Sequence, residues 1–200
     1  MSSNQHSYEV IYLTGTPAAG KSTVAEQLCK RIKPLEVFDY GERLLRYITE
    51  KAQKNVSYAE LRGDSATIIT SEDVGAVDEL LINWVQERRL HAHLVIDTHA
   101  VTKEGYGFRV TPFSFDQAKR LAPSQILVIF TTPELARDRI IQHAAGRRLP
   151  SEFEAGFHAA LQGSVAVSYG IMLGVPIQFI DGSQELTTIV DWILARISLD

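Results

Sequence analysis

The chain has 200 residues, 45% of them hydrophobic and 22% charged, with a formal net charge of -4. This length and composition fit one globular α/β domain with a full core. The negative charge argues against a surface that coats nucleic acid, although it leaves room for a local basic pocket. The single Cys29 excludes a disulfide framework, and no apolar run approaches the length of a membrane span. We therefore expect a cytoplasmic protein without a membrane partner. Residues 1–7, which lack the parts of a signal peptide, are expected to form a flexible tail.

In chain order, apolar runs alternate with segments of helical periodicity. Short runs such as 126–130 predict buried strands, and apolar residues at helical spacing, such as Val77, Leu81 and Val85, predict a helix that begins at Ser71. Residues 55–70 fit no single pattern. We expect strands at 8–14, 35–38, 94–97, 126–130 and 175–180, helices at 21–32, 41–54, from 71 onward, 115–121, 133–144, 151–173 and 185–197, and a loop at 98–113.

This alternation predicts the fold class. Five strands separated by helices indicate a five-stranded parallel sheet with helices on both faces. We find no repeat and no linker, so we expect a single domain over residues 8–200. In such folds ligands bind beyond the carboxyl ends of the strands, so the residues that follow each strand are the first candidates for function.

The segment after the first strand carries the strongest motif. Residues 15–22 read Gly-Thr-Pro-Ala-Ala-Gly-Lys-Ser and fit the phosphate-binding pattern G-x-x-x-x-G-K-[ST] at every fixed position. Gly15 and Gly20 permit close approach of the backbone to an anion. The N–H groups of Ala18, Ala19 and the following helical turn can then surround a β-phosphate, aided by the helix dipole.

The side chains of the motif complete this P-loop. We expect Lys21 to reach the β- and γ-phosphates, the Ser22 hydroxyl to ligate Mg²⁺, and Thr23 to contact the α-phosphate. The alternative interpretation is a glycine-rich turn with a solvated lysine. The strand before the motif and the helix after it favour binding of a nucleoside triphosphate together with Mg²⁺.

A second candidate lies at the end of the strand at 94–97. Asp97 occupies the place where such folds put the acid that holds Mg²⁺ through water, although an acid there can also simply cap the next turn. Thr98 and His99 follow directly and are expected to point into the same cleft. For His99 a packed, hydrogen-bonding role is an equal alternative.

Asp39 and Tyr40 follow the second strand and so lie at the same edge of the sheet. They are candidates for an acceptor pocket. The equal alternative is an ordinary strand-to-helix turn in which Asp39 caps the helix.

Arginines gather near the helix at 133–144 and the loop after it. Phosphoryl transfer needs positive charge around the γ-phosphate and exclusion of water, and arginines on a closing loop supply both. We therefore expect Arg147 and Arg148 to be catalytic residues of a small lid near 145–150. Arg137 is as well explained by a surface role.

The stretch Gly105-Tyr106-Gly107-Phe108-Arg109 lies close after Asp97. It is placed to cover an acceptor, with an aromatic ring against a base and Arg109 against a phosphate. A plain hairpin with aromatic packing is the equal alternative.

Four segments together share the pattern of one known family. They are Gly-Thr-Pro-Ala-Ala-Gly-Lys-Ser-Thr at 15–23, Phe38-Asp39-Tyr40-Gly41, Val95-Ile96-Asp97-Thr98-His99-Ala100 followed by Lys103, Gly105 and Tyr106, and Val167-Ser168-Tyr169-Gly170 with Gly174. Through them, and over nearly its whole length, the chain resembles the nucleoside-monophosphate kinases, specifically the archaeal type of adenylate kinase. The third segment is the most specific of the four.

The resemblance implies ATP on the phosphate loop, an acceptor nucleotide near 39–45 and 97–109, and a lid around 145–150. Arg139 falls where an arginine of the family stacks on the adenine of ATP, and the two lid arginines fall where the family contacts phosphates. The implied acceptor-binding residues are Asp39, Tyr40, Arg43, Thr98, His99, Tyr106 and Arg109.

The chain also departs from the family. Where the family has arginines for the acceptor phosphate, near 62–68, only Arg62 is present, and the family's Asn-Arg pair after the lid corresponds to Gln162-Gly163. The resemblance therefore implies ATP as the phosphoryl donor but does not identify the acceptor.

We interpret the sequence as an ATP-dependent kinase that acts on a nucleotide or a related small molecule. If the acceptor is a hydroxyl, Asp39 or Asp97 is the expected base. One alternative is an ATP-hydrolysing switch or binding protein, which an exposed apolar patch on the helix at 151–173 would support. A nucleic-acid end kinase is the other, and the net negative charge counts against it. No residue pattern specifies an oligomeric state.

Overall fold

The computed structural model describes residues 8–52, 68–142 and 149–197. Its strands are β1 (Val10–Gly15), β2 (Leu35–Asp39), β3 (His93–Asp97), β4 (Val101–Glu104), β5 (Gly107–Val110), β6 (Gln125–Phe130) and β7 (Ile177–Asp181). Its helices are α1 (Lys21–Arg31), α2 (Tyr40–Ala52), α5 (Ser71–Arg88), α6 (Phe115–Leu121), α7 (Pro133–Gln142), α8 (Glu152–Leu173) and α9 (Leu186–Leu194).

The main sheet confirms the predicted fold class. Its five strands run in the order β2-β3-β1-β6-β7, and every neighbouring pair is parallel. β1 lies at the centre and is buried along its whole length. The strand that ends in Asp97 therefore lies directly beside the strand that leads into the phosphate loop, with Leu13 paired to Asp97.

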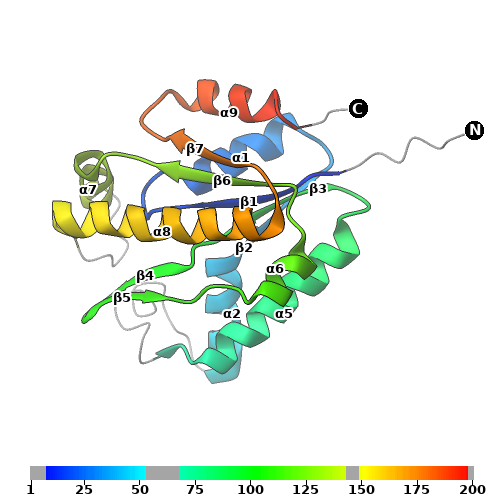
Figure 1. Cartoon of the computed structure of the whole chain (residues 1–200), viewed down its shortest axis with the longest axis horizontal. Coiled ribbons are helices and arrows are strands. Elements are labelled where there is room, and N and C mark those ends of the chain that lie inside the picture. The colour runs from blue at the N-terminus through cyan, green and yellow to red at the C-terminus, as the bar shows by residue number, and fades with distance from the viewer. Residues whose placement is uncertain (1–7, 53–67, 143–148, 198–200) are drawn as a thin grey trace, which may run out of the picture.

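Helices cover both faces of this sheet, as Figure 1 shows. Successive side chains of a strand point to opposite faces. Accordingly Ile11 and Leu13 of β1 pack in a core cluster with residues of α1 and α9, while Val10 packs with α5 and Tyr12 packs with α8. The apolar residues of β1 thus contribute to the hydrophobic core on both faces of the sheet.

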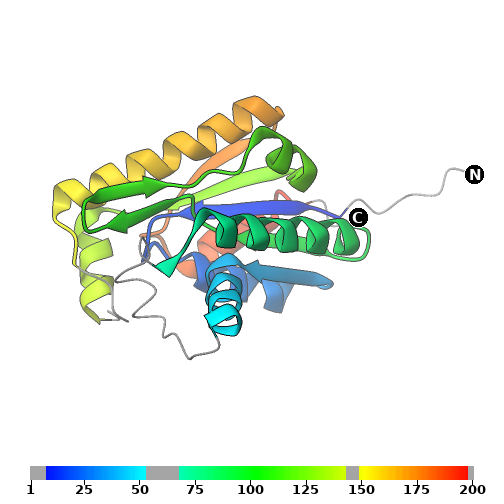
Figure 2. The same cartoon turned by 90° about the horizontal axis from the view of Figure 1, so that it is seen from below.

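The segment 98–113 corrects the expectation of a loop. β4 and β5 pair antiparallel, from Val101 with Val110 to Glu104 with Gly107, and leave only residues 105 and 106 as the turn. The hairpin alternative is therefore confirmed. The hairpin lies beside the long helix α8, which Figure 2 shows from a second side.

Two expected features lie outside the described residues. These are the tail at 1–7 and most of the lid at 145–150, of which only Leu149 and Pro150 are described. None of the described helices combines the length and the apolarity that crossing a membrane requires.

Candidate active site

The phosphate loop connects β1 to α1, and its two fixed glycines have clear physical reasons. Gly15 has a φ of 143°, and a Cβ there would lie 2.0 Å from the carbonyl oxygen of Ile129. Gly20 has a φ of 103°, which an L side chain rarely adopts. Ala18 also takes a left-handed backbone conformation, with a φ of 62°. Strained backbone of this kind clusters at functional sites.

The N-terminus of α1 differs from those of three other helices. Thr70, Ser114 and Ser151 each form a complete capping box at the start of α5, α6 and α8. At α1, by contrast, Gly20 offers no side-chain cap, and no acidic residue lies in the first turn. No side chain therefore caps the first turn of α1, and the positive end of the helix favours an anion there.

Lys21 and Ser22 lie where the motif predicts. The Nζ atom of Lys21 donates to the carbonyl oxygens of Gly15 and Thr16, at 3.2 and 3.4 Å. The Ser22 hydroxyl donates to Oδ2 of Asp97 at 3.1 Å. The structure thus brings together the lysine, the hydroxyl and the strand-end acid that the sequence assigned to one site.

Burial dominates the electrostatics of Asp97. It raises the pKa of this carboxyl, and the nearby Asp39 adds to the rise, whereas Lys21 and the hydrogen bond from Ser22 oppose it. A nearby cation stabilises the charged form of a buried carboxylate of this kind.

The oxygen donors of Ser22 and Asp97 suit Mg²⁺, which prefers hard oxygen ligands and keeps several positions for water and phosphate. Among the described residues no three His, Cys, Asp or Glu side chains form a metal-binding cluster. The residues present fit a cation that is shared with a bound triphosphate.

Arg139 lies against the phosphate loop. Its two terminal nitrogens donate to the carbonyl oxygens of Ala18, at 3.2 Å, and Gly182, at 3.0 Å. The backbones of these loops touch, because a Cβ on Gly182 would lie only 2.5 Å from the carbonyl oxygen of Ala19. Arg139 therefore braces the loop, and its contact with adenine stays a prediction. Thr23 is exposed next to the same loop.

A cavity of about 410 Å³ opens beside the phosphate loop. It is bounded by the ends of β2 and β3, the start of α5, the hairpin β4–β5, and the facing parts of α7 and α8. Its polar lining includes Lys21, Ser22, Asp39, Asp78, Asp97, Thr98, His99, Lys103, Glu104, Arg109, Thr131, Glu154 and His158.

The capping interpretation of Asp39 is confirmed, and its role in an acceptor pocket stays a prediction. Its Oδ1 accepts a hydrogen bond from the backbone N–H of Glu42 at 2.9 Å and so caps α2, and the residue also lines the cavity. Tyr40 lines the cavity too, but its hydroxyl donates to Asp78 at 2.7 Å. The hydroxyl proton of Tyr40 is therefore engaged by Asp78, and contact of Tyr40 with an acceptor stays a prediction.

The remaining predicted acceptor residues divide into two groups. Thr98, which is buried, and His99, which is exposed, both line the cavity, and so does Arg109. Tyr106 is 71% exposed at the hairpin turn, and Arg43 lies over the ring of Phe38, with 5.4 Å from its guanidinium carbon to the ring centre. Neither belongs to the described cavity lining.

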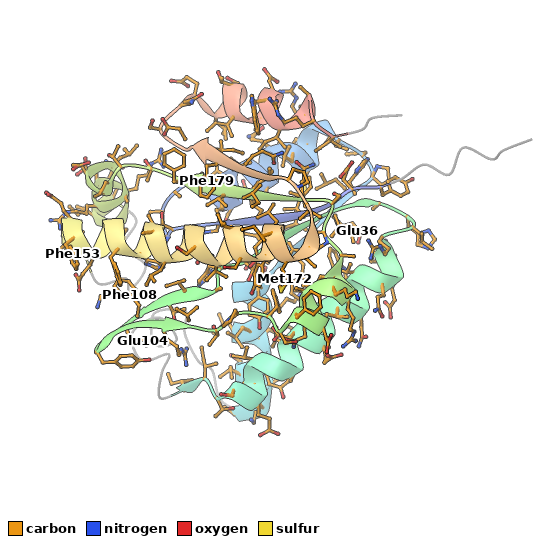
Figure 3. The ribbon with its side chains drawn as sticks, viewed as in Figure 1. Glu36, Glu104, Phe108, Phe153, Met172 and Phe179 are labelled. Atoms are coloured by element: carbon orange, nitrogen blue, oxygen red, sulfur yellow. The ribbon has the colours of Figure 1, made fainter. Side chains whose placement is uncertain are left out.

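Charged side chains of the hairpin form ion pairs. Nε of Arg109 lies 3.2 Å from Oε1 of Glu104, and Nζ of Lys103 lies 3.1 Å from Oε1 of Glu154 on α8. Figure 3 shows Phe108 reaching from the hairpin toward the first half of α8. There its ring contacts His158, with 5.2 Å between the ring centres.

Sequence reasoning missed two polar residues of this region, Asp78 and His158, and assigned no role to a third, Gln162. Asp78 accepts hydrogen bonds from Tyr40 and Gln117, and burial raises the pKa of its carboxyl. His158 and Gln162 are buried on α8. Each of the three breaks an otherwise apolar helical stripe, and that interruption is the signal that identifies them.

Gly163, next to Gln162, packs closely against a neighbouring side chain. A Cβ at this position would lie 3.2 Å from the ring of Phe179, which occupies the adjacent space. Arg62, Arg147 and Arg148 lie outside the described residues. Arg137 donates to the carbonyl oxygen of Pro150, the last residue of the expected lid.

Comparisons with known proteins agree with this geometry. Residues 14–154 match a family model described as AAA domain. No curated protein matches the chain. An unliganded sugar kinase from Janibacter sp. HTCC2649 is similar at a TM-score of 0.54 and 13% identity, with 96% of each chain covered. Shikimate kinase from Acinetobacter baumannii, solved in complex with shikimate, is similar at a TM-score of 0.54 and 16% identity, with 96% of each chain covered. At these identities the likeness shows the fold alone.

Proposed function

The chain belongs to the AAA domain family, and from this premise we propose that it is an ATP-dependent kinase that phosphorylates a hydroxyl group of a small molecule. One observation carries the proposal: the uncapped phosphate loop, with Lys21 and the Ser22–Asp97 pair, borders a cavity of about 410 Å³. A cavity of this volume suits a small-molecule acceptor.

On the donor side, backbone N–H groups at the start of α1 bind the β-phosphate, and Lys21 leaves the loop carbonyls to reach the β- and γ-phosphates. Ser22 and Asp97 would hold Mg²⁺, which supplies charge neutralisation at the phosphates when it is bound. In this proposal Arg147 and Arg148 complete the phosphate contacts from the lid, and Arg139 borders the adenine.

The charges of the cavity favour a hydroxyl acceptor over a phosphate. Its described lining contains five carboxylates, Asp39, Asp78, Asp97, Glu104 and Glu154, against three cations, Lys21, Lys103 and Arg109. Two of these cations are paired with carboxylates, and we assign Lys21 to ATP. A second phosphate would meet net negative charge there, whereas a neutral or cationic hydroxyl compound would not.

A hydroxyl acceptor needs a base, and Asp39 is the better candidate. Asp97 is hydrogen-bonded to Ser22 and assigned to the cation, while Asp39 lines the cavity from the neighbouring strand end. A carboxylate in that place can accept the proton of the attacking hydroxyl. The sugar kinase and shikimate kinase names of the two similar structures agree with a hydroxyl acceptor.

The resemblance to archaeal-type adenylate kinases makes AMP the alternative acceptor. The position next to Gln162 supplies no arginine for it, because that residue is Gly163. AMP would then depend on Arg62 and the lid arginines.

One observation favours the switch alternative. Phe153 on α8 is 78% exposed and stacks on Phe157, with 5.9 Å between the ring centres. An exposed aromatic pair is typical of a surface that contacts a partner. In that case ATP turnover would go to water and rise when the partner is present.

The test is ATP consumption with Mg²⁺ against sugars and other polyhydroxyl compounds, nucleosides, AMP and other nucleoside monophosphates, with water as the control. We expect stoichiometric transfer to a hydroxyl compound. Transfer to AMP alone would replace the proposed acceptor class, and turnover only to water would refute the kinase.

Asp39→Asn sharpens this test. Asparagine caps a helix as well as aspartate does, so the variant removes the base and keeps the cap. We expect a fall in transfer of about 10²-fold or more with unchanged binding of ATP. Asp116→Asn, in the first turn of α6, is the matched control.

A further inference from the structure

The first residue of the hairpin is held by α8 from both sides of its peptide backbone. The N–H group of Val101 donates to Oε1 of Gln162 at 3.1 Å, and its carbonyl oxygen accepts from Nε2 of His158 at 3.0 Å. All three residues are buried. Two side chains one helical turn apart therefore fix the place where the hairpin begins.

The other end of the Gln162 amide contacts the phosphate-loop strand. Its Nε2 donates to the hydroxyl of Thr14 at 2.8 Å, and Thr14 is fully buried directly before Gly15. Gln162 itself is only 1% exposed. One buried side chain thus bridges β1 and β4, and Figures 1 and 2 show α8 running alongside these strands.

The two ends of this bridge belong to different halves of the site. Thr14 adjoins the loop proposed to hold ATP, whereas Val101 begins the hairpin whose residues line the acceptor side of the cavity. We propose that Gln162 is a positioning residue that fixes the acceptor hairpin relative to the phosphate loop, an inference that rests on the proposed kinase function. In-line transfer demands such control, because a misplacement of about 1 Å can cost about 10²-fold in rate.

The chemistry of the bridge supports this role. A buried amide is costly unless its donor and acceptor are both paired, and here they pair with two separate elements. If Gln162 served packing alone, an apolar residue of similar size would suffice. If it positions the hairpin, a nucleotide that orders the phosphate loop should also order the hairpin, through the hydrogen bond between Thr14 and Gln162.

The test compares variants at the Thr14 end of the bridge, which leave the hairpin contacts in place. Thr14→Val removes the hydroxyl with little change of shape, and Thr14→Ser keeps it. Because Thr14 also contacts the Tyr12 hydroxyl, Tyr12→Phe is the control for that contact. Gln162→Leu removes the whole bridge.

The readout is amide hydrogen exchange of residues 101–110 in the full chain, with and without Mg²⁺ and β,γ-imido-ATP. In the wild type, Thr14→Ser and Tyr12→Phe, we expect the nucleotide to slow hairpin exchange about tenfold. In Thr14→Val and Gln162→Leu the slowing should fall below about twofold while nucleotide affinity stays within about threefold.

Kinetics with the acceptor that the ATP-consumption test identifies would give a second readout. Gln162→Leu should lower kcat more than it raises the acceptor KM, and adding Thr14→Val should cause little further loss. The inference alone would be overturned if the nucleotide slowed amide exchange of the hairpin as much in Thr14→Val as in the wild type. It would also be overturned if the nucleotide bound to the wild type without slowing that exchange. Failure of the nucleotide to bind would overturn the inference and the proposed function together.

Discussion

The donor half and the acceptor half of the site are built in different ways. The donor half consists largely of backbone: the loop at 15–22, the N-terminus of α1, which has no side-chain cap, and the carbonyl oxygens that accept from Lys21 and Arg139. The acceptor half consists of side chains from the end of β2, from α5, from the hairpin and from α8. In the proposed kinase, the backbone of the loop would bind phosphate, and the side chains of the acceptor half would select the acceptor.

The largest expected effect tests the donor half. Lys21→Ala should lower phosphoryl transfer about 10³-fold, because it removes the charge that reaches the γ-phosphate. The fold should remain, since the hydrogen bonds from Lys21 to the carbonyl oxygens of Gly15 and Thr16 lie within the phosphate loop itself. Lys30→Ala, in the last turn of the same helix, is the control. Unchanged transfer would remove the phosphate loop from the mechanism, and circular dichroism would verify folding.

Asp97→Asn should weaken the binding of Mg²⁺ but raise the stability of the nucleotide-free protein. Transfer should fall about 10²-fold, and half-maximal activity should need more Mg²⁺. The nucleotide-free variant should nevertheless be more stable at neutral pH, because burial disfavours the charged carboxylate in the folded state.

The sign of the pH dependence follows. The folded pKa of Asp97 is raised, so its charge lowers stability above that pKa, and the penalty vanishes below the unfolded pKa near 3.8. Thermal unfolding measured from acid to neutral pH should show that Asp97→Asn is more stable than the wild type only near neutral pH. Asp138→Asn on α7 is the control, and a variant less stable than the wild type at neutral pH would contradict the account.

The sequence predicts much of the donor half because its information is local. The spacing within 15–22 fixes the loop, and the rule that parallel strands end at one edge places Asp97 beside it. The sheet follows from the alternation of apolar runs and helical patterns. The roles of the loop residues stay predictions, but the structure brings Lys21, Ser22 and Asp97 together as expected.

The acceptor half is harder to predict because its contacts join distant segments. Periodicity marks Asp78, His158 and Gln162 as positions on apolar stripes, but it does not say which partner would satisfy a buried polar group there. The hairpin was similarly ambiguous, because Gly105-Tyr106 is not one of the strong two-residue turn signals. These residues became interpretable only once β1, β4 and α8 were placed side by side.

A smaller effect tests the contact between the two loops of the donor half. Gly182→Ala should weaken ATP binding about tenfold, because its Cβ would lie 2.5 Å from the carbonyl oxygen of Ala19 and displace the loop. Gly156→Ala, in the exposed part of α8, meets nothing within 4 Å and should instead stabilise the protein by about 0.5–1 kcal/mol. Calorimetric titration of both variants with ATP would measure the contrast, and equal affinities would refute it.

The last expected effect concerns the acceptor half, where the hydroxyl of Tyr40 donates to the carboxylate of Asp78. Tyr40→Phe removes the donor 2.7 Å from Oδ1 of Asp78 and should lower the free energy of unfolding by about 1–3 kcal/mol at neutral pH. Burial already raises the pKa of Asp78, and loss of the donor should raise it further. A raised acid pKa lowers stability as pH rises through it, so the cost should shrink in acid, where the carboxyl is protonated. Tyr47→Phe, on the same helix, is the control. Urea unfolding at two pH values would check the difference, and a cost independent of pH would mean that Asp78 is not the group that Tyr40 supports.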